Sequence, residues 1–152
     1  MLFRSCGDAV PDYGECHSIV IQGTPSACVD ALTDYERLPS WQRAVRSATV
    51  LERDAQGRGT VVEYEVDAKL KRVRYRLRQI YDGPDRLGCE YLGGDFRDFS
   101  GEWRFVTVPG GTRVELELRI DPGRLVPRPV RAAIAHAVMS RALADLKRHL
   151  EA

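Results

Sequence analysis

The side chains best suited to chemistry in this chain are tyrosines and one glutamine in segments of alternating polarity. Tyr64 lies in segment 60–68, Tyr75 and Gln79 lie in segment 72–81, and Tyr91 lies in segment 86–92. A phenol titrates at about pH 10, so a tyrosine needs help from a base before it can act in acid–base catalysis. These four residues are weak catalytic candidates, and the catalytic residues stay unknown.

The cysteines and histidines are too scattered to predict a metal site. Cys6, Cys16, Cys28 and Cys89 form no CxxC pair, and structural zinc sites draw on closely spaced ligands. We therefore expect no structural metal and no cofactor, and we interpret the cysteines as buried free thiols. A Cys6–Cys16 bridge is the alternative for a secreted protein. His136 lies off the apolar stripe of its predicted helix, so we do not expect it to be catalytic.

Size and charge narrow the class of protein. The chain has 152 residues, 43% of them hydrophobic, and a net charge of +1. This length suits one domain with its own core, and the charge does not indicate a nucleic-acid partner. No apolar run is long enough to span a membrane, and the start of the chain lacks the apolar region of a signal peptide. We predict a cytoplasmic protein, either a monomer or a weak homodimer.

The N-terminal segment 1–14 differs from the rest of the chain. Residues Met1–Ser5 resemble the translation of a sequencing-adapter tail more than a protein segment. We expect segment 1–14 to be poorly ordered or artefactual, and Met1–Ser5 to carry no function. The single domain is then expected to cover residues 15–152.

Period-two alternation through the middle of the chain predicts an antiparallel sheet. The expected strands cover residues 16–22, 46–53, 60–68, 72–81, 86–92, 99–108 and 112–120. Glu63 and Glu65 share one charged face, and Arg74 and Arg76 share another of opposite sign. Strands 60–68 and 72–81 should therefore pair through cross-strand ion pairs. The alternative is an arginine stripe that binds phosphate or RNA, but the acidic neighbours would cancel its field.

Two short helical segments and one long helix complete the pattern. Thr24 and Pro25 are suited to the N-cap and first residue of a helix that runs to about Thr33. Segment 34–39 predicts a second short turn. Segment 130–150 predicts a helix of about 30 Å, enough to cross the sheet. Its apolar stripe contains Ala132, Ala135, Met139, Ala142, Leu143, Leu146 and Leu150, with Val138 at its edge. Arg141 and Asp145 are expected to form an exposed i,i+4 pair.

The long helix must cover the apolar face of the sheet, and two features predict a cavity between them. Several inward aromatic residues carry polar groups that need partners when buried. The first half of the helix offers mostly alanines, which leaves room. The residues expected to contact a ligand are Leu38, Trp41, Tyr64, Val66, Tyr75, Leu77, Gln79, Tyr91, Phe96, Phe99, Trp103, Leu116, Leu118, Ala135, Val138, Met139 and Ala142.

Three stretches carry a resemblance to a known superfamily: LTDYERLPSW at 32–41, GDFRDFSGEWRF at 94–105 and GTRV at 111–114. From Cys16 to Glu151 the chain resembles the SRPBCC superfamily, which includes START and birch-pollen-allergen-like proteins. It is most similar to the bacterial polyketide cyclase/dehydrase and coenzyme Q-binding group. The resemblance implies an α+β helix-grip fold, with a curved antiparallel sheet of about seven strands, two short helices and a long C-terminal helix. Members share a cavity rather than one reaction.

We predict that the protein binds a hydrophobic small molecule (a lipid, a quinone or a polyketide-like aromatic) between the sheet and the C-terminal helix. We expect no nucleic-acid partner and no integral membrane association. Two alternatives stay open: a polyketide cyclase/dehydratase-type enzyme that uses the same cavity, and a protein-interaction module. An enzyme predicts convergent polar groups with perturbed pKa values. An interaction module predicts a filled cavity and an exposed apolar patch.

Overall fold

The computed structural model describes residues 14–68, 71–123 and 126–152. Its elements in chain order are β1 (Gly14–Ile21), α1 (Pro25–Thr33), η1 (Tyr35–Ser40), β2 (Val45–Arg53), β3 (Gly59–Ala68), β4 (Lys71–Tyr81), β5 (Arg86–Gly94), β6 (Asp98–Val108), β7 (Gly111–Asp121) and α2 (Arg128–Glu151). Predictions about residues 1–13, including the role of Met1–Ser5 and the state of Cys6, lie outside the described residues. Gly14 begins β1.

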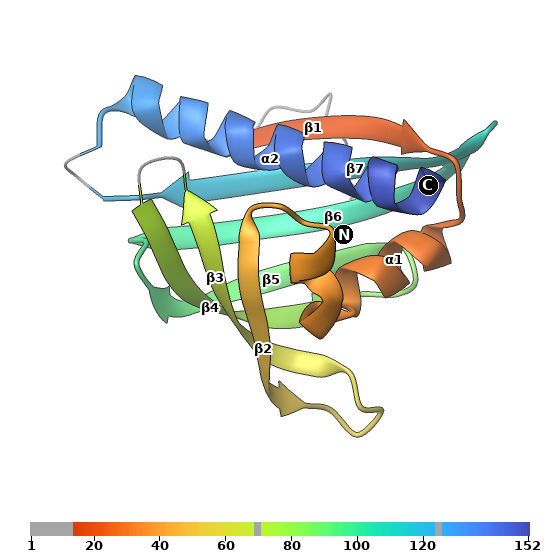
Figure 1. Ribbon diagram of the computed structural model, residues 1–152, viewed down its shortest axis with the longest axis horizontal. Helices are drawn as coiled ribbons and strands as arrows, with labels where there is room; N and C mark the ends of the chain where they lie inside the picture. The colour runs from red at the N-terminus through yellow and green to blue at the C-terminus, as the bar shows by residue number, and fades with distance from the viewer. Residues whose placement is uncertain (1–13, 69–70, 124–125) are drawn as a thin grey trace.

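The seven strands form one antiparallel sheet in the order β1-β7-β6-β5-β4-β3-β2. Neighbours from β2 to β7 follow one another in the chain, and β1 closes the order by pairing with β7, for example Ile19 with Val114. The sheet curves around α2, which lies across its concave side (Figure 1). The helix-grip fold predicted from the sequence is confirmed. No described helix is long and apolar enough to cross a membrane.

Strand β5 runs further than predicted. Alternation predicts an end at Leu92, whereas β5 continues through Gly93 and Gly94. Gly94 has a φ of 143° and lies opposite Tyr75 in β4. A Cβ at this position would lie 2.5 Å from the Tyr75 Cα, so only glycine permits this close approach.

The two short helices begin and end where their residues dictate. The Thr24 hydroxyl accepts a hydrogen bond of 3.1 Å from the Ala27 amide and so caps α1. Cys28 and Leu32 are the buried residues of α1, and they pack into the main core. The 3₁₀ helix η1 buries Tyr35 and Leu38 against β2 and β3.

The ion pairs predicted between β3 and β4 are present on the outer face. The Arg76 Nε lies 2.8 Å from a Glu63 oxygen, and an Arg74 nitrogen lies 3.3 Å from a Glu65 oxygen. The same pairs are direct neighbours in the strand register. Cross-strand charge thus agrees with the backbone pairing, which confirms that the two strands are antiparallel partners.

Some charged residues on the outer face of the sheet are buried rather than exposed to water. Arg104 on β6 is completely buried, and Glu115 on β7 is 3% exposed. The Arg104 Nε lies 3.3 Å from a Glu115 carboxylate oxygen, and another guanidinium nitrogen lies 3.5 Å from a Glu102 oxygen. Arg104 is therefore buried although it alternates with the inward-facing Trp103 and Phe105, and its buried charge is compensated by two acidic neighbours.

Helix α2 buries one stripe and exposes the rest. Ala135, Met139, Leu143 and Leu146 are buried, as the apolar period predicts. Ala132 is exposed, as is Val130, so the predicted stripe begins one turn too early. Periodicity alone does not reveal where along a helix packing begins.

Asp145 is not part of an exposed pair with Arg141. Its side chain is fully buried, and its carboxylate accepts hydrogen bonds of 3.0 Å from the backbone amide and from the Nε of Arg43. The prediction is wrong because residues 41–44 lie against this flank of α2, where water was expected. Asp145 therefore fastens the segment between η1 and β2 to α2.

Among the cysteines that the structure describes, one differs from the expectation of free thiols. Cys28 and Cys89 are free, whereas Cys16 is disulfide-bonded and its partner lies outside the described residues. The prediction of a buried free thiol is thus wrong for Cys16. Cys28 is fully buried, and Cys89 is partly buried on the inner face of β5.

Candidate functional site

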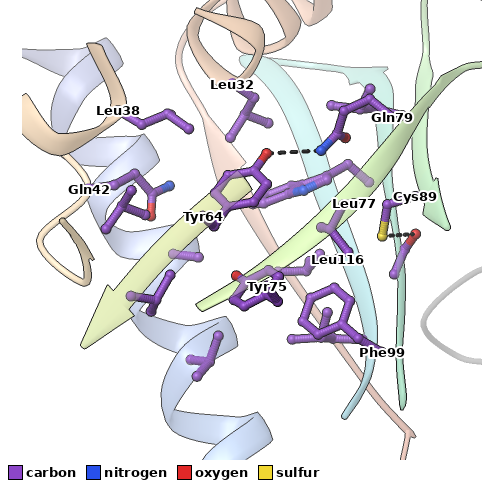
Figure 2. Close-up of a pocket in the computed structure, with 18 of the residues that line it drawn as sticks. Leu32, Leu38, Gln42, Tyr64, Tyr75, Leu77, Gln79, Cys89, Phe99 and Leu116 are labelled. Atoms are coloured by element: carbon purple, nitrogen blue, oxygen red, sulfur yellow. Dashed lines mark hydrogen bonds between the residues drawn. The ribbon is translucent and has the colours of Figure 1, made fainter. Parts of the chain in front are cut away.

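A cavity of about 150 Å³ lies between the concave face of the sheet and α2, with η1 at one side (Figure 2). Its wall is built by α1, η1, strands β2 to β7 and α2. The lining residues are Leu32, Tyr35, Leu38, Gln42, Ala44, Val45, Tyr64, Val66, Tyr75, Leu77, Gln79, Leu87, Gly88, Cys89, Phe99, Gly101, Trp103, Leu116, Leu118, Val138 and Ala142.

Alternation along the strands places most of these side chains. On β4, Tyr75, Leu77 and Gln79 face the cavity, whereas Arg74 and Arg76 point to the outer face. Successive side chains of a strand point to opposite faces, so one strand supplies both a charged surface and an apolar wall. β3, β6 and β7 contribute to the wall by the same rule.

The space exists because α2 presents small side chains to it. Only Val138 and Ala142 of α2 line the cavity. Further along the helix, the larger side chains of Leu143 and Leu146 are buried in the main core and do not line the cavity. A small residue opposite a curved sheet leaves a gap that a leucine would fill.

Stacked aromatic rings form one wall of the cavity. The ring centroids of Tyr64 and Tyr75 lie 5.4 Å apart with 22° between planes. Those of Tyr75 and Phe99 lie 5.2 Å apart with 25° between planes. These stacks hold three aromatic rings in a row along one side of the cavity.

One polar pair within the wall is already satisfied. The Gln79 amide donates a hydrogen bond of 2.9 Å to the Tyr64 hydroxyl, drawn as a dashed line in Figure 2. Gln79 is 8% exposed, so the bond replaces the water that both groups lose on burial. Burial, followed by the nearby Tyr75, raises the pKa of Tyr64 well above its usual value.

Two other polar groups have no partner among the described residues. No hydrogen bond joins the Tyr75 hydroxyl or the Gln42 side-chain amide to another described residue, yet Gln42 is only 7% exposed. In Figure 2 the Tyr75 hydroxyl points toward α2, and Gln42 lies on that same side of the cavity. Neither group is among the fully buried polar atoms that lack a partner, so both are accessible from the cavity and are suited to bind a polar atom of a guest molecule.

Tyr35 lines the cavity, but its hydroxyl is engaged elsewhere. The Tyr81 hydroxyl donates a bond of 2.7 Å to the Gly59 carbonyl, so it accepts the 2.9 Å bond from the Tyr35 hydroxyl. Burial is the main cause that raises the pKa of Tyr35. Tyr35 therefore contributes its ring to the wall and its hydroxyl to a bridge between η1 and the sheet.

Cys89 adds a thiol to the wall. Its Sγ lies 3.5 Å from the Gly101 carbonyl oxygen, to which it donates (Figure 2). Burial raises the pKa of this thiol to about 12. The thiol is therefore neutral near pH 7 and is not poised as a nucleophile.

The wall can donate hydrogen bonds but holds no charged side chain among the residues that line it. Burial raises the pKa of Tyr75 as well as that of Tyr64, so both phenols stay protonated at neutral pH. Protonated phenols and amides can bind a carbonyl or hydroxyl oxygen. None of them can accept a proton readily, so the lining offers no general base.

Most residues predicted to contact a ligand are brought together around this cavity. Those that line it are Leu38, Tyr64, Val66, Tyr75, Leu77, Gln79, Phe99, Trp103, Leu116, Leu118, Val138 and Ala142. Three of the four weak catalytic candidates are among them. The fourth, Tyr91, donates its hydroxyl to the Phe96 carbonyl at 2.7 Å and does not line the cavity.

Four further predicted residues also lie outside the lining. Trp41 stacks on His149 with ring centroids 4.6 Å apart. Phe96 packs behind the wall, with its ring 5.3 Å from that of Tyr75. Ala135 and Met139 are fully buried in the packed core beneath α2. No contact with a molecule in the cavity follows for any of these.

Sequence reasoning missed several lining residues. They are Leu32, Tyr35, Gln42, Ala44, Val45, Leu87, Gly88, Cys89 and Gly101. Leu87 and Cys89 occupy the same alternation phase as Tyr91, so period two was a usable signal for them. Gln42 and Ala44 lie in the irregular segment between η1 and β2, where no period predicts direction.

Comparison with known proteins gives one family match. The sequence profile of the family described as polyketide cyclase/dehydrase and lipid transport matches residues 24–147. This range includes every cavity-lining residue. No curated protein sequence matches the chain.

Solved structures share the fold at low sequence identity. A START superfamily protein from Mycobacterium smegmatis has a TM-score of 0.84 at 16% identity, over 91% of this chain and 97% of its own. The Zhui aromatase/cyclase from Streptomyces sp. R1128 has a TM-score of 0.77 at 18% identity, over 91% and 93%. The protein TTHA0849 from Thermus thermophilus has a TM-score of 0.73 at 23% identity, over 91% and 94%. At such identities the likeness establishes the fold alone.

Proposed function

Because the chain belongs to the polyketide cyclase/dehydrase and lipid transport family, we propose that it binds an apolar, oxygen-bearing aromatic molecule in the cavity between the sheet and α2. The observation that carries this proposal is the pair of unpartnered donors, the Tyr75 hydroxyl and the Gln42 amide, beside stacked aromatic rings. The aromatic wall suits a guest with an aromatic ring, and the two donors suit a carbonyl or phenol oxygen.

The size of the cavity narrows the class of ligand. A volume of about 150 Å³ is smaller than the roughly 300–1,000 Å³ of common ligand pockets and compares with cavities that hold a small aromatic molecule. A quinone or a polyketide-like aromatic fits this description better than a long lipid chain. A larger ligand would require α2 or η1 to move outward.

The main alternative is a polyketide cyclase/dehydratase-type enzyme in the same cavity. Such a reaction needs a group that accepts a proton, and the lining residues supply only neutral donors at neutral pH. This favours binding over catalysis. The third possibility, a protein-interaction module, predicts a filled cavity, and the open space beside α2 argues against it.

Native mass spectrometry of the full chain, purified from its expression host, tests the proposal. We expect a co-purified apolar molecule that dissociates on unfolding. Titration calorimetry with 2-naphthol and with naphthalene then separates the contribution of the hydroxyl group to binding from that of the rings. We expect 2-naphthol to bind more tightly. If neither compound binds and no ligand co-purifies, the proposal is wrong. If an added poly-β-ketone analogue loses water in the presence of the protein, the enzyme is the better description.

A further inference from the structure

A second group of side chains converges away from the cavity, between β1 and α2. Glu15, His17 and His136 offer one ligand atom each, and these atoms all lie within 4.8 Å of one another. The His17 Nε2 lies 2.8 Å from a Glu15 carboxylate oxygen, and the His136 Nδ1 lies 3.7 Å from the same oxygen. The two imidazole rings meet edge to face, with centroids 4.9 Å apart.

The fold explains why these three residues meet. Glu15 and His17 are two positions apart on β1, so they share a face with Ile19 and Ile21. Ile21 is fully buried, which identifies this face as the one that α2 covers. Helix α2 packs along β1, as Figure 1 shows, and brings His136 over the start of the strand.

This group lies on the flank of α2 that faces away from the cavity. Val138 and Ala142 are the residues of α2 that line the cavity. His136 precedes Val138 by two positions, which is about 200° around a helix of 3.6 residues per turn. A molecule in the cavity would therefore not touch His136, and the two sites are separate.

We propose that Glu15, His17 and His136 bind one divalent transition-metal ion of the Zn²⁺ type and thereby link edge strand β1 to α2. Ligand atoms about 2.0–2.2 Å from a tetrahedral zinc lie about 3.4 Å from one another. The separations of 2.8 and 3.7 Å from the Glu15 oxygen bracket this value, and the two imidazole nitrogens lie within 4.8 Å of each other. Rotation of the imidazole side chains would complete the site.

The chemistry of the donor set selects the class of metal. Two imidazole nitrogens and one carboxylate oxygen suit zinc and its neighbours, whereas calcium and magnesium prefer oxygen ligands alone. The His136 side chain is 62% exposed and that of Glu15 is 28% exposed, so an ion can enter from solvent and keep water as its remaining ligand. The ion would hold α2 against the sheet edge rather than act on a molecule in the cavity.

Zinc titration of the untagged full chain, stripped with a chelator and kept under non-reducing conditions, tests this site. We expect one Zn²⁺ per chain with micromolar affinity. We expect zinc affinity to fall by at least about 10-fold in each of three variants, Glu15→Gln, His17→Ala and His136→Ala. Loss of a residue that only hydrogen-bonds to a metal ligand already costs about that much. His149→Ala is the matched control, because His149 lies on α2 against Trp41 and should leave the affinity unchanged.

Two further measurements keep the test decisive. Zn²⁺ at about 100 times its dissociation constant should raise the melting temperature by about 5–10 °C, and His136→Ala, which replaces an exposed side chain, should abolish the rise. The Co²⁺ complex should lack a thiolate-to-metal absorption band, since Cys28 and Cys89 are not ligands. The proposal is overturned by the absence of one-to-one binding, by an equal loss in His149→Ala, or by a thiolate band.

Discussion

Strands β3 and β4 have two faces built from alternate residues of the same segments, and the two faces handle polar groups differently. On the outer face, Glu63 and Glu65 each contact an arginine of β4. On the inner face, Tyr64 is paired with Gln79, while the Tyr75 hydroxyl has no partner among the described residues. The polar groups of the outer face are paired with one another, whereas the inner face has a donor that can bind a guest molecule.

This difference separates a structural surface from a binding surface. Ion pairs on the outer face are exposed to water, so each contributes little to stability but helps to set the register. Inner-face groups lie in a space of lower dielectric constant than water. A hydrogen bond between an inner-face donor and a guest molecule is therefore stronger than the same bond at the surface. Changes on the inner face should therefore alter binding and reactivity strongly, and changes on the outer face only weakly.

The largest expected effect concerns the reactivity of the inner-face thiol. Burial raises the pKa of Cys89 from 9.0 to about 12, so its thiolate fraction near neutral pH should be about 1,000-fold smaller than that of an exposed cysteine. Iodoacetamide at about pH 8 should label Cys89 only after unfolding, as peptide mass spectrometry would reveal. Rapid labelling of Cys89 in the native protein would contradict the burial of this thiol.

The same burial predicts how stability depends on pH. The folded state holds the proton of Cys89 more tightly than the unfolded chain, so the stabilisation is complete below about pH 9 and is lost as the pH rises toward about 12. Cys28, whose pKa burial raises to about 11, acts in the same direction. Urea unfolding between these pH values measures the decline. Cys89→Ala should make it shallower, and Cys28 and the buried tyrosines Tyr64 and Tyr75 should account for the rest.

Filling the cavity should have the next largest effect. Ala142→Phe places a ring in the space between α2 and the stacked aromatics and should weaken 2-naphthol binding by about 100-fold, with a cost in stability of about 1–3 kcal/mol. The control is Ala132→Phe, which adds the same ring at an exposed position of the same helix. This control should leave 2-naphthol affinity unchanged. An equal loss of affinity in both variants would mean that a ring anywhere on α2 disturbs binding, and that the cavity beside Ala142 is not the binding site.

Removal of one hydroxyl should have a smaller and more specific effect. Tyr75→Phe should weaken 2-naphthol binding by about 2–10-fold and leave naphthalene binding unchanged, since one neutral hydrogen bond is worth about 0.5–1.5 kcal/mol. Tyr64→Phe is the matched variant: its hydroxyl already accepts a bond from Gln79, so it should lose stability more than affinity. Removal of the whole ring in Tyr75→Ala should reduce the free energy of 2-naphthol binding by more than it reduces the free energy of unfolding. Calorimetry and urea melts measure both quantities.

The smallest effect is expected on the outer face. Arg76→Gln removes the contact of 2.8 Å with Glu63, but the Arg76 side chain is 57% exposed. The loss should be about 0.2–1 kcal/mol at low salt and less at high salt, with no change in 2-naphthol affinity. An effect on affinity as large as that of Tyr75→Phe would remove the distinction between the two faces.

Prediction from sequence succeeds where a short local pattern determines direction. Alternation identifies Tyr64, Tyr75 and Gln79 as inward-facing, and Thr24 followed by Pro25 marks the start of α1. It fails where packing between distant segments decides burial. Asp145 is buried because the segment at Arg43 lies on it, and Arg104 is buried although it alternates with inward-facing residues.

The sequence by itself determined the strands, the helices and the apolar inner face, because each depends on a period of two or 3.6 residues within one segment. Only the tertiary structure decided the volume of the cavity, the free donors of Tyr75 and Gln42, and the meeting of Glu15 and His17 with His136. These features depend on how α2 and the segment after η1 settle on the curved sheet. Contacts between segments distant along the chain leave no period within either one.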